Sequence, residues 1–186
     1  IGDIVWAEGI LYVASNGYIS RLVGDGERAS DWVSYDLELD KPEEGISALW
    51  ARGDTLWVAT SYSTEYQGEE IPAGNGLRLS VDGGITWKHF KTENIFPEGV
   101  RFREGIRFPD NYTTCYDIAS VGQTMWFSFT SGFAVKTHDL GKTWEHVLPD
   151  TSGFRFQNPN HHGNALVAYG DTIWVGAFGG IHRSTD

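Results

Sequence analysis

One eight-residue motif occurs twice in the chain, as Ser80-Val81-Asp82-Gly83-Gly84-Ile85-Thr86-Trp87 and as Thr137-His138-Asp139-Leu140-Gly141-Lys142-Thr143-Trp144. A short Ser, Thr or Asp side chain can accept hydrogen bonds from backbone N–H groups of its own turn, and Gly supplies positive φ. The Trp that ends the motif can pack a large apolar surface between neighbouring sheets. We therefore expect a structural rather than a catalytic role for the motif residues, including the start of a third copy at the chain end: Ser80, Asp82, Gly84, Thr86, Trp87, Thr137, Asp139, Gly141, Thr143, Trp144, Ser184 and Asp186.

A second repeat lies upstream of each motif. Short apolar runs of the kind expected for strands buried on both faces follow Gly-containing turns. Their central aromatic residues are separated by 45, 69 and 48 positions, which fits a unit near 45 residues with insertions. The four runs are 11–15, 56–60, 125–129 and 173–177, centred on Tyr12, Trp57, Trp126 and Trp174.

The motif resembles the Asp-box, or BNR, repeat of sialidase-like and sortilin-like β-propellers, and residues 24–32 resemble a degenerate copy that ends at Trp32. This resemblance implies an all-β fold built of four-stranded antiparallel blades. We expect a single partial propeller over residues 1–186, with blades at about 1–40, 41–92, 93–149 and 150–186 and the last blade incomplete. The same reasoning predicts part of a six- to eight-bladed ring, completed by the same longer chain or by another chain.

Composition narrows the class of partner. The 186 residues carry 14 Lys and Arg against 25 Asp and Glu, a formal net charge of -11, which argues against nucleic acid as a ligand. No apolar run is long enough for membrane insertion as a helix, and a single Cys excludes an internal disulfide or a Cys-rich metal site. We expect no cofactor and no metal. Acidic charge and aromatic loops are typical of an extracellular, periplasmic or cell-surface protein.

Three long segments are predicted to lie on one face, opposite the Asp boxes: the loop 61–76 and the connections from 91 to about 115 and from 148 to about 164. Long loops held on a rigid scaffold usually carry function. Aromatic rings together with Arg, Asn and carboxylate groups suit recognition of a protein or a glycan. The alternation of Phe and Arg in these segments also fits additional β-strands. The candidate binding residues are Tyr62, Tyr66, Glu69, Glu70, Arg101, Arg103, Arg107, Tyr112, Arg155, His161 and His162.

The sequence therefore predicts a non-catalytic binding propeller of a secreted or cell-surface protein, with no residue assigned to catalysis. The alternative is a glycoside hydrolase that uses loop carboxylates such as Glu70 and Asp110 as acid and base. The strings nearest to the Phe/Tyr-Arg-Ile-Pro motif of sialidases, at Phe102-Arg103-Glu104-Gly105 and at Arg107-Phe108-Pro109, do not match it. A purely structural spacer is a third reading.

Overall fold

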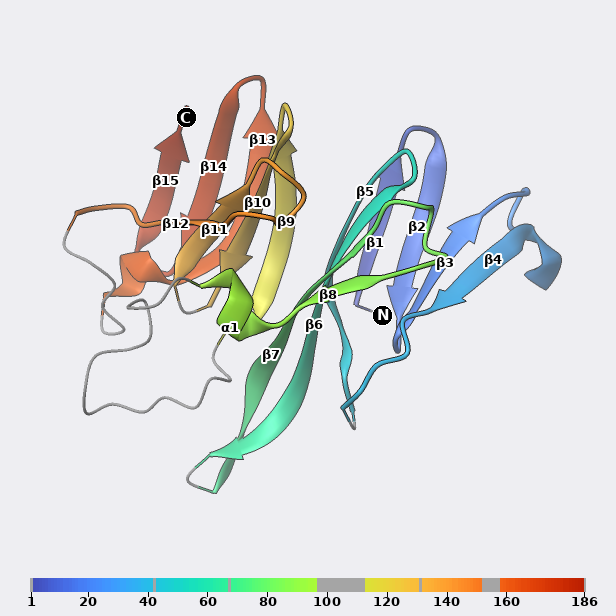
Figure 1. Ribbon diagram of the computed structural model, residues 1–186, viewed down its shortest axis with the longest axis horizontal. Coiled ribbons are helices and arrows are strands. Elements are labelled where there is room, and N and C mark those ends of the chain that lie inside the picture. Colours follow the sequence, from blue (N-terminus) through green and yellow to red (C-terminus); the bar gives the residue numbers. More distant parts are fainter. Residues whose placement is uncertain are drawn as a thin grey trace.

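The computed structural model describes residues 2–41, 43–66, 68–96, 113–130, 132–151 and 158–185. These residues form four antiparallel sheets that follow one another along the chain (Figure 1). The predicted all-β fold is confirmed. Each sheet is a meander in which consecutive strands are neighbours, the arrangement that short connections favour.

The strands are assigned to the sheets in chain order. Sheet 1 holds β1 (Asp3–Ala7), β2 (Ile10–Ser15), β3 (Tyr18–Leu22) and β4 (Trp32–Asp36). Sheet 2 holds β5 (Gly45–Arg52), β6 (Thr55–Tyr66), β7 (Glu69–Ser80) and β8 (Lys88–Phe90). Sheet 3 holds β9 (Cys115–Val121), β10 (Thr124–Phe129), β11 (Phe133–Thr137) and β12 (Glu145–Val147). Sheet 4 holds β13 (Gly163–Tyr169), β14 (Thr172–Ala177) and β15 (Gly180–Ser184), and the short helices are η1 (Ala29–Asp31), α1 (Thr92–Ile95) and η2 (Pro159–His161).

The first strands of the sheets lie next to one another, because β1 contacts β5, β5 contacts β9 and β9 contacts β13. The sheets pack face to face, with one apolar cluster at each of the three junctions between successive sheets. The middle cluster contains Trp57, Phe127 and Phe129, all fully buried. Burial of one such side chain contributes about 1.5–3 kcal/mol, so these junctions hold the array together.

The second strands of the sheets differ in burial. Residues 56–60 of β6 and 125–129 of β10 are buried on both faces, as the apolar runs predicted. In β2 and β14 burial alternates, and Trp174 of β14 is 40% exposed. The prediction of two-sided burial is therefore wrong for β2 and β14, because sheets 1 and 4 each have one neighbouring sheet among the described residues, whereas sheets 2 and 3 have two.

The turns between first and second strands all lie at the upper side of Figure 1, and the tip of the β6–β7 hairpin lies at the lower side. We call this lower side the insertion face. Residues 61–76, predicted as a loop, are mostly strand: β6 and β7 stay paired from Leu56–Ser80 out to Tyr66–Glu69, past a bulge at Ala59 and Ser61. The loop prediction is wrong here, since the chain extends the sheet as a hairpin.

None of the helices in the described part of the chain is long and apolar enough to span a membrane.

Candidate binding surface and the turns that carry it

The tip of the β6–β7 hairpin is acidic. Glu65 lies directly opposite Glu70, and Tyr66 lies opposite Glu69. All three Glu side chains are exposed. Like charges in directly opposite strand positions repel each other, so the tip holds this charge at some cost to the stability of the hairpin.

Tyr62 lies further down the hairpin and is half-buried. The Lys41 ammonium nitrogen lies 5.1 Å from the centre of the Tyr62 ring, within the range of a cation–π interaction. Lys41 belongs to the connection between sheets 1 and 2, so this contact ties the hairpin to that connection. The Tyr62 ring is therefore already in contact with another side chain of the same chain.

A buried polar cluster anchors the base of the hairpin, and the sequence analysis missed it. Arg78 of β7 lies 3.4 Å from a carboxylate oxygen of Glu44 and 3.6 Å from one of Asp40. Asn75 donates from Nδ2 to Asp40 at 2.7 Å and to Glu44 at 3.0 Å, and its carbonyl accepts from His89 at 2.6 Å. Arg78 and Glu44 are only 6% and 8% exposed. A buried charge needs a partner, so this cluster fixes where the hairpin leaves the sheet.

The other predicted binding residues divide into two groups. Arg101, Arg103, Arg107, Tyr112, Arg155 and the alternative acid Asp110 lie outside the described residues, as does the side chain of Tyr66. His161 and His162 are described, and both are buried.

His161 contacts Asn158 Nδ2 at 3.1 Å and Asp150 Oδ2 at 3.2 Å. His162 hydrogen-bonds through Nδ1 to the carbonyl of Thr130 and stacks on Phe178. Both rings thus make contacts inside the protein, and a ligand-contacting role for these two residues stays a prediction.

The two Ser/Thr-x-Asp-x-Gly-x-Thr-Trp turns close on their own side chains. Asp82 accepts from the Thr86 hydroxyl at 2.5 Å, from the Thr86 N–H at 2.9 Å and from the Ser80 hydroxyl at 2.7 Å. These bonds, those from Thr86 first, lower the pKa of Asp82 from 3.8 to about 2. A carboxylate held in this way is a turn-closing acceptor rather than a general acid.

The second turn repeats this geometry. Asp139 accepts from the Thr143 N–H and hydroxyl at 2.9 and 2.7 Å, and from the Thr137 hydroxyl at 2.9 Å. The hydrogen bonds from Thr143, then the one from Thr137, hold the pKa of Asp139 well below its usual range. The last copy, Ser184-Thr185-Asp186, ends on a residue outside the described ones.

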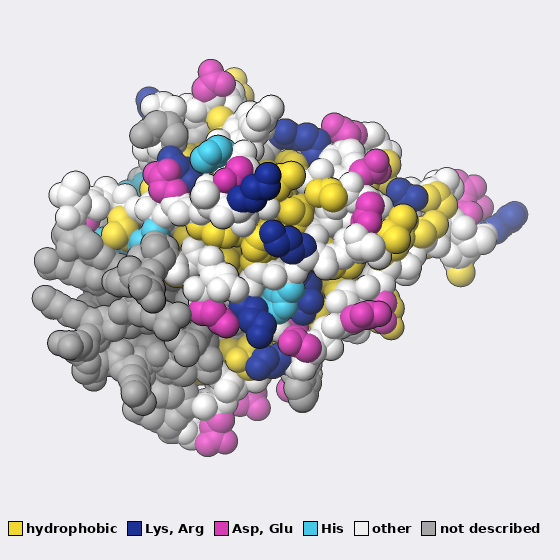
Figure 2. Space-filling model, viewed as in Figure 1, with side chains coloured by type: hydrophobic (Ala, Val, Ile, Leu, Met, Phe, Trp, Pro, Cys, Tyr) yellow, Lys and Arg dark blue, Asp and Glu magenta, His cyan; other side chains and the backbone are white. Residues whose placement is uncertain are grey.

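Carboxylates on the visible face are dispersed. Figure 2 shows the Asp and Glu side chains scattered among Lys, Arg and apolar side chains rather than gathered in one place. Within the described ranges, no three His, Cys, Asp or Glu side chains are grouped so that they could hold a metal ion.

Comparison with known proteins places the fold in one class. No family model matches the chain, and no curated protein matches it. Solved structures do: YCF48 bound to a D1 peptide aligns with a TM-score of 0.51 and 14% identity, over 89% of this chain and 42% of that one. A GH74 xyloglucanase from Xanthomonas campestris aligns with a TM-score of 0.50 and 12% identity, over 90% and 25%. The fold is that of a β-propeller.

A third structure is similar in size to this chain. The computationally designed Ika4 protein aligns with a TM-score of 0.53 and 11% identity, over 99% of this chain and 89% of Ika4. The chain thus spans less than half of the YCF48 chain and a quarter of the xyloglucanase chain. At these identities the likeness concerns the fold alone.

Proposed function

We propose that this chain is a binding module of the Asp-box class, from a secreted or cell-surface protein, that recognises a protein or glycan through its insertion face. One observation carries the proposal. The β6–β7 hairpin extends the sheet outward and displays Glu65, Glu69 and Glu70 at its tip. The cluster of Arg78 with Glu44 and Asp40 holds its base.

The chemistry of the tip favours a basic partner. Glu65 and Glu70 repel each other across the hairpin, and a Lys- or Arg-rich surface would relieve that repulsion. The net charge of -11 attracts such a partner at long range. A propeller of the same fold, YCF48, has been solved with a bound peptide, which supports protein recognition by this architecture in general.

The test uses an array of synthetic peptides graded from acidic to basic, beside an array of immobilised glycans. The tip variant carries Glu65→Gln, Glu69→Gln and Glu70→Gln. A matched control removes the same charge from the opposite side through Glu27→Gln, Asp54→Asn and Asp171→Asn, all exposed. We expect the native chain to bind basic peptides, the tip variant to lose this binding, and the control to keep it.

Added salt should weaken the interaction, because exposed charges are screened within about 10 Å at 0.1 M. Equal binding by the tip variant and the native chain would exclude the hairpin tip as the recognition element.

The glycoside hydrolase alternative requires two carboxyl groups facing each other about 5–10 Å apart in a cleft. Glu70, its one candidate among the described residues, is exposed at the hairpin tip opposite Glu65. Burial raises the pKa of Asp117, but the oxygens of this carboxylate accept from the N–H groups of Leu166 at 2.7 Å and Ile118 at 2.8 Å. These contacts make Asp117 a structural acceptor, so we assign no hydrolase activity.

A further inference from the structure

The β6–β7 hairpin extends past the first strand of its sheet. β5 pairs with β6 as far as Gly45 and Ser61, and the described residues place no strand on this side of β6 beyond Ser61. β6 itself continues to Tyr66 and stays paired with β7 on its other side. Within the described part of the chain, residues 62–66 therefore form an open strand edge. Such an edge offers unpaired backbone N–H and C=O groups to a further strand.

The pairing of β5 with β6 shows which residues direct their backbone groups to this edge. In an antiparallel pair the N–H and C=O groups of one residue point to the same side, and those of its neighbours point to the other side. Thr55 lies opposite Arg52 across a turn of two residues, so its backbone groups face β5. The extra residues of the two bulges lie in β5 and β7, so the alternation along β6 is unbroken. Ser61, Ser63 and Glu65 therefore face the same side as Thr55.

Pro72 of β7 supports this orientation independently. It lies opposite Ser63. Because proline has no N–H group, it fits a strand pair only where its nitrogen points away from the neighbouring strand. The backbone groups of Ser63 therefore point away from β7 as well, toward the open edge, and those of Glu65, two residues further on, do the same. Each of these two residues offers one N–H and one C=O group to an added strand.

The two faces of the hairpin differ in exposure. In β7, Ile71 and Ala73 are buried, whereas Glu70 is exposed. Glu65 lies opposite Glu70 and is exposed on the same face. In a strand added to the open edge, the residues opposite Ser63 and Glu65 would place their side chains on this exposed face too. The two carboxylates there favour Lys or Arg at those positions.

We propose that the hairpin recognises its partner by strand addition: an extended segment of a partner protein, with Lys or Arg at alternate positions, pairs antiparallel with residues 62–66. The segment takes the side of β6 that β5 occupies nearer the core. Backbone hydrogen bonds then supply affinity, and the alternate basic side chains supply specificity. This inference rests on the proposed function, because it uses the same acidic hairpin, and it adds the conformation of the partner and the bonds that hold it.

The first test measures binding of fluorescein-labelled peptides to the 186-residue chain by fluorescence anisotropy. The probe is the capped peptide Lys-Val-Lys-Val-Lys. One version carries N-methyl groups on the backbone nitrogens of its second and third Lys, and the matched version carries them on its two Val residues. Both versions have the same charge and the same number of methyl groups, so attraction between charges does not separate them.

The two versions lose N–H groups on opposite sides of the peptide. When the Lys side chains lie on the exposed face, the Lys N–H groups point to β6 and the Val N–H groups point away from it. We expect the version methylated on Lys to lose at least about tenfold in affinity, because it gives up two hydrogen bonds. The version methylated on Val should bind like the unmethylated probe.

The substitution Ser63→Pro tests the edge from the side of the protein. It removes an N–H group that points to the open edge and takes no bond from the pair with β7. We expect it to weaken the unmethylated probe by about fivefold relative to Ser63→Ala, which keeps the N–H group. Equal Tm values of the two variants show that the fold is intact. If Ser63→Pro unfolds the chain, the methylated peptides decide alone.

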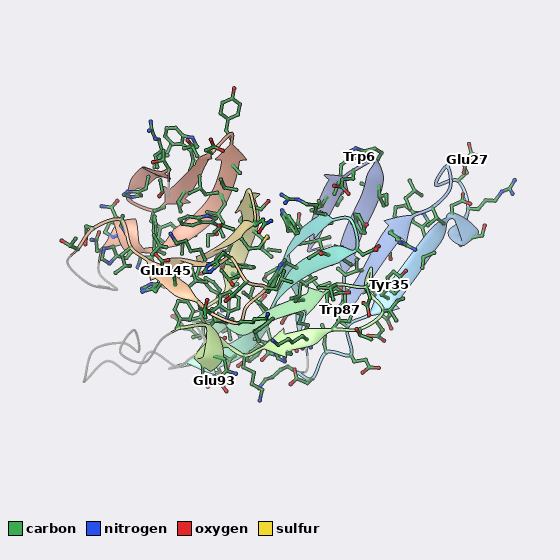
Figure 3. All side chains as sticks on the ribbon, turned by 45° about the horizontal axis from the view of Figure 1, so that its top comes forward. Trp6, Glu27, Tyr35, Trp87, Glu93 and Glu145 are labelled. Carbon is green, nitrogen blue, oxygen red and sulfur yellow. The ribbon has the colours of Figure 1, made fainter. Side chains whose placement is uncertain are left out.

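The charge of the tip is tested by Glu65→Gln, which should weaken the unmethylated probe by about two- to fivefold, as expected for an exposed ion pair. The matched control is Glu27→Gln, which should leave the affinity unchanged. Glu27 is exposed and lies in the connection between β3 and β4, at the outer edge of sheet 1 (Figure 3).

The outcomes separate this inference from the proposed function. Equal affinity of the two methylated probes, with binding still weakened by Glu65→Gln, would overturn strand addition and keep recognition of a basic partner by the tip. A greater loss from methylation of Val than of Lys would also overturn the proposed pairing. If no probe binds at about 1 mM, both proposals are wrong.

Discussion

Replacement of Trp144 by Ala tests whether the motif Trp holds adjacent sheets together. The indole meets Trp57, Phe90 and Phe127 edge to face. Three such pairs contribute about 1.5–4.5 kcal/mol in all, beyond burial of area, and Trp→Ala changes in cores cost about 3–5 kcal/mol. Because Trp144 is only half-buried, we expect the lower end, a loss of about 3 kcal/mol in the free energy of unfolding.

Urea unfolding followed by near-ultraviolet circular dichroism measures this loss. A loss of 3 kcal/mol corresponds to a fall in Tm of about 6–12 °C for a chain of this size. The matched control is Trp6→Ala, because Trp6 is 68% exposed and should change stability by no more than about 0.5 kcal/mol. If the two variants unfold at the same urea concentration with unchanged slope, Trp144 does not hold the junction and the reasoning is refuted.

Two further predictions concern the turns. The low pKa of Asp82, about 2 against 3.8 for the free side chain, stabilises the fold above about pH 4, and this contribution is lost as pH falls toward 2. Asp82→Asn should therefore reduce the fall in the free energy of unfolding between about pH 4 and pH 2, as measured by urea unfolding across that range. The same fall with pH in the variant and in the native chain would contradict this expectation. Gly141→Ala should destabilise the fold by about 1–3 kcal/mol more than Gly122→Ala. Both positions have positive φ, but only a Cβ at Gly141 would meet the Phe90 ring, so equal thermal unfolding of the two variants would show that the contact is tolerated.

Local signals in the sequence predicted the sheet architecture well. The paired Gly turns and apolar runs mark the first two strands of each sheet, since turn chemistry and strand period act within a few residues. The bonds within the Asp82 and Asp139 turns are local for the same reason. These features depend on residues that are close in sequence, and not on residues from distant parts of the chain.

Long-range features were not predictable in the same way. Arg78 stands between Leu77 and Leu79, and period-two alternation predicts an exposed side chain there. The structure buries it because sheet 2 is covered on both faces, and Glu44, 34 positions away, neutralises it. The sequence offers one signal here, a single Arg inside an apolar strand. A buried Arg requires a carboxylate partner, but the sequence does not show which carboxylate that is.

The first strands of neighbouring sheets are joined by hydrogen bonds between a side chain and the backbone, and the direction of these bonds differs from one junction to the next. Sheets 2, 3 and 4 each bulge near the start of the first strand. Asp117 follows the bulge of sheet 3 and accepts from the Leu166 N–H of sheet 4, as Asp3 of sheet 1 accepts from the Leu49 N–H of sheet 2 at 2.9 Å.

Sheet 2 reverses the direction of this bond. Its bulged residue, Ser47, donates to the Cys115 carbonyl of sheet 3 at 2.7 Å, and Ala48 replaces the Asp. Sheet 4 has the same pair of types, a polar Asn164 at the bulge followed by Ala165. Acceptor side chains in sheets 1 and 3 thus alternate with a donor side chain in sheet 2. The direction of the bond therefore follows from residue type: the carboxylates of Asp3 and Asp117 accept, whereas the hydroxyl of Ser47, the residue at the bulge of sheet 2, donates.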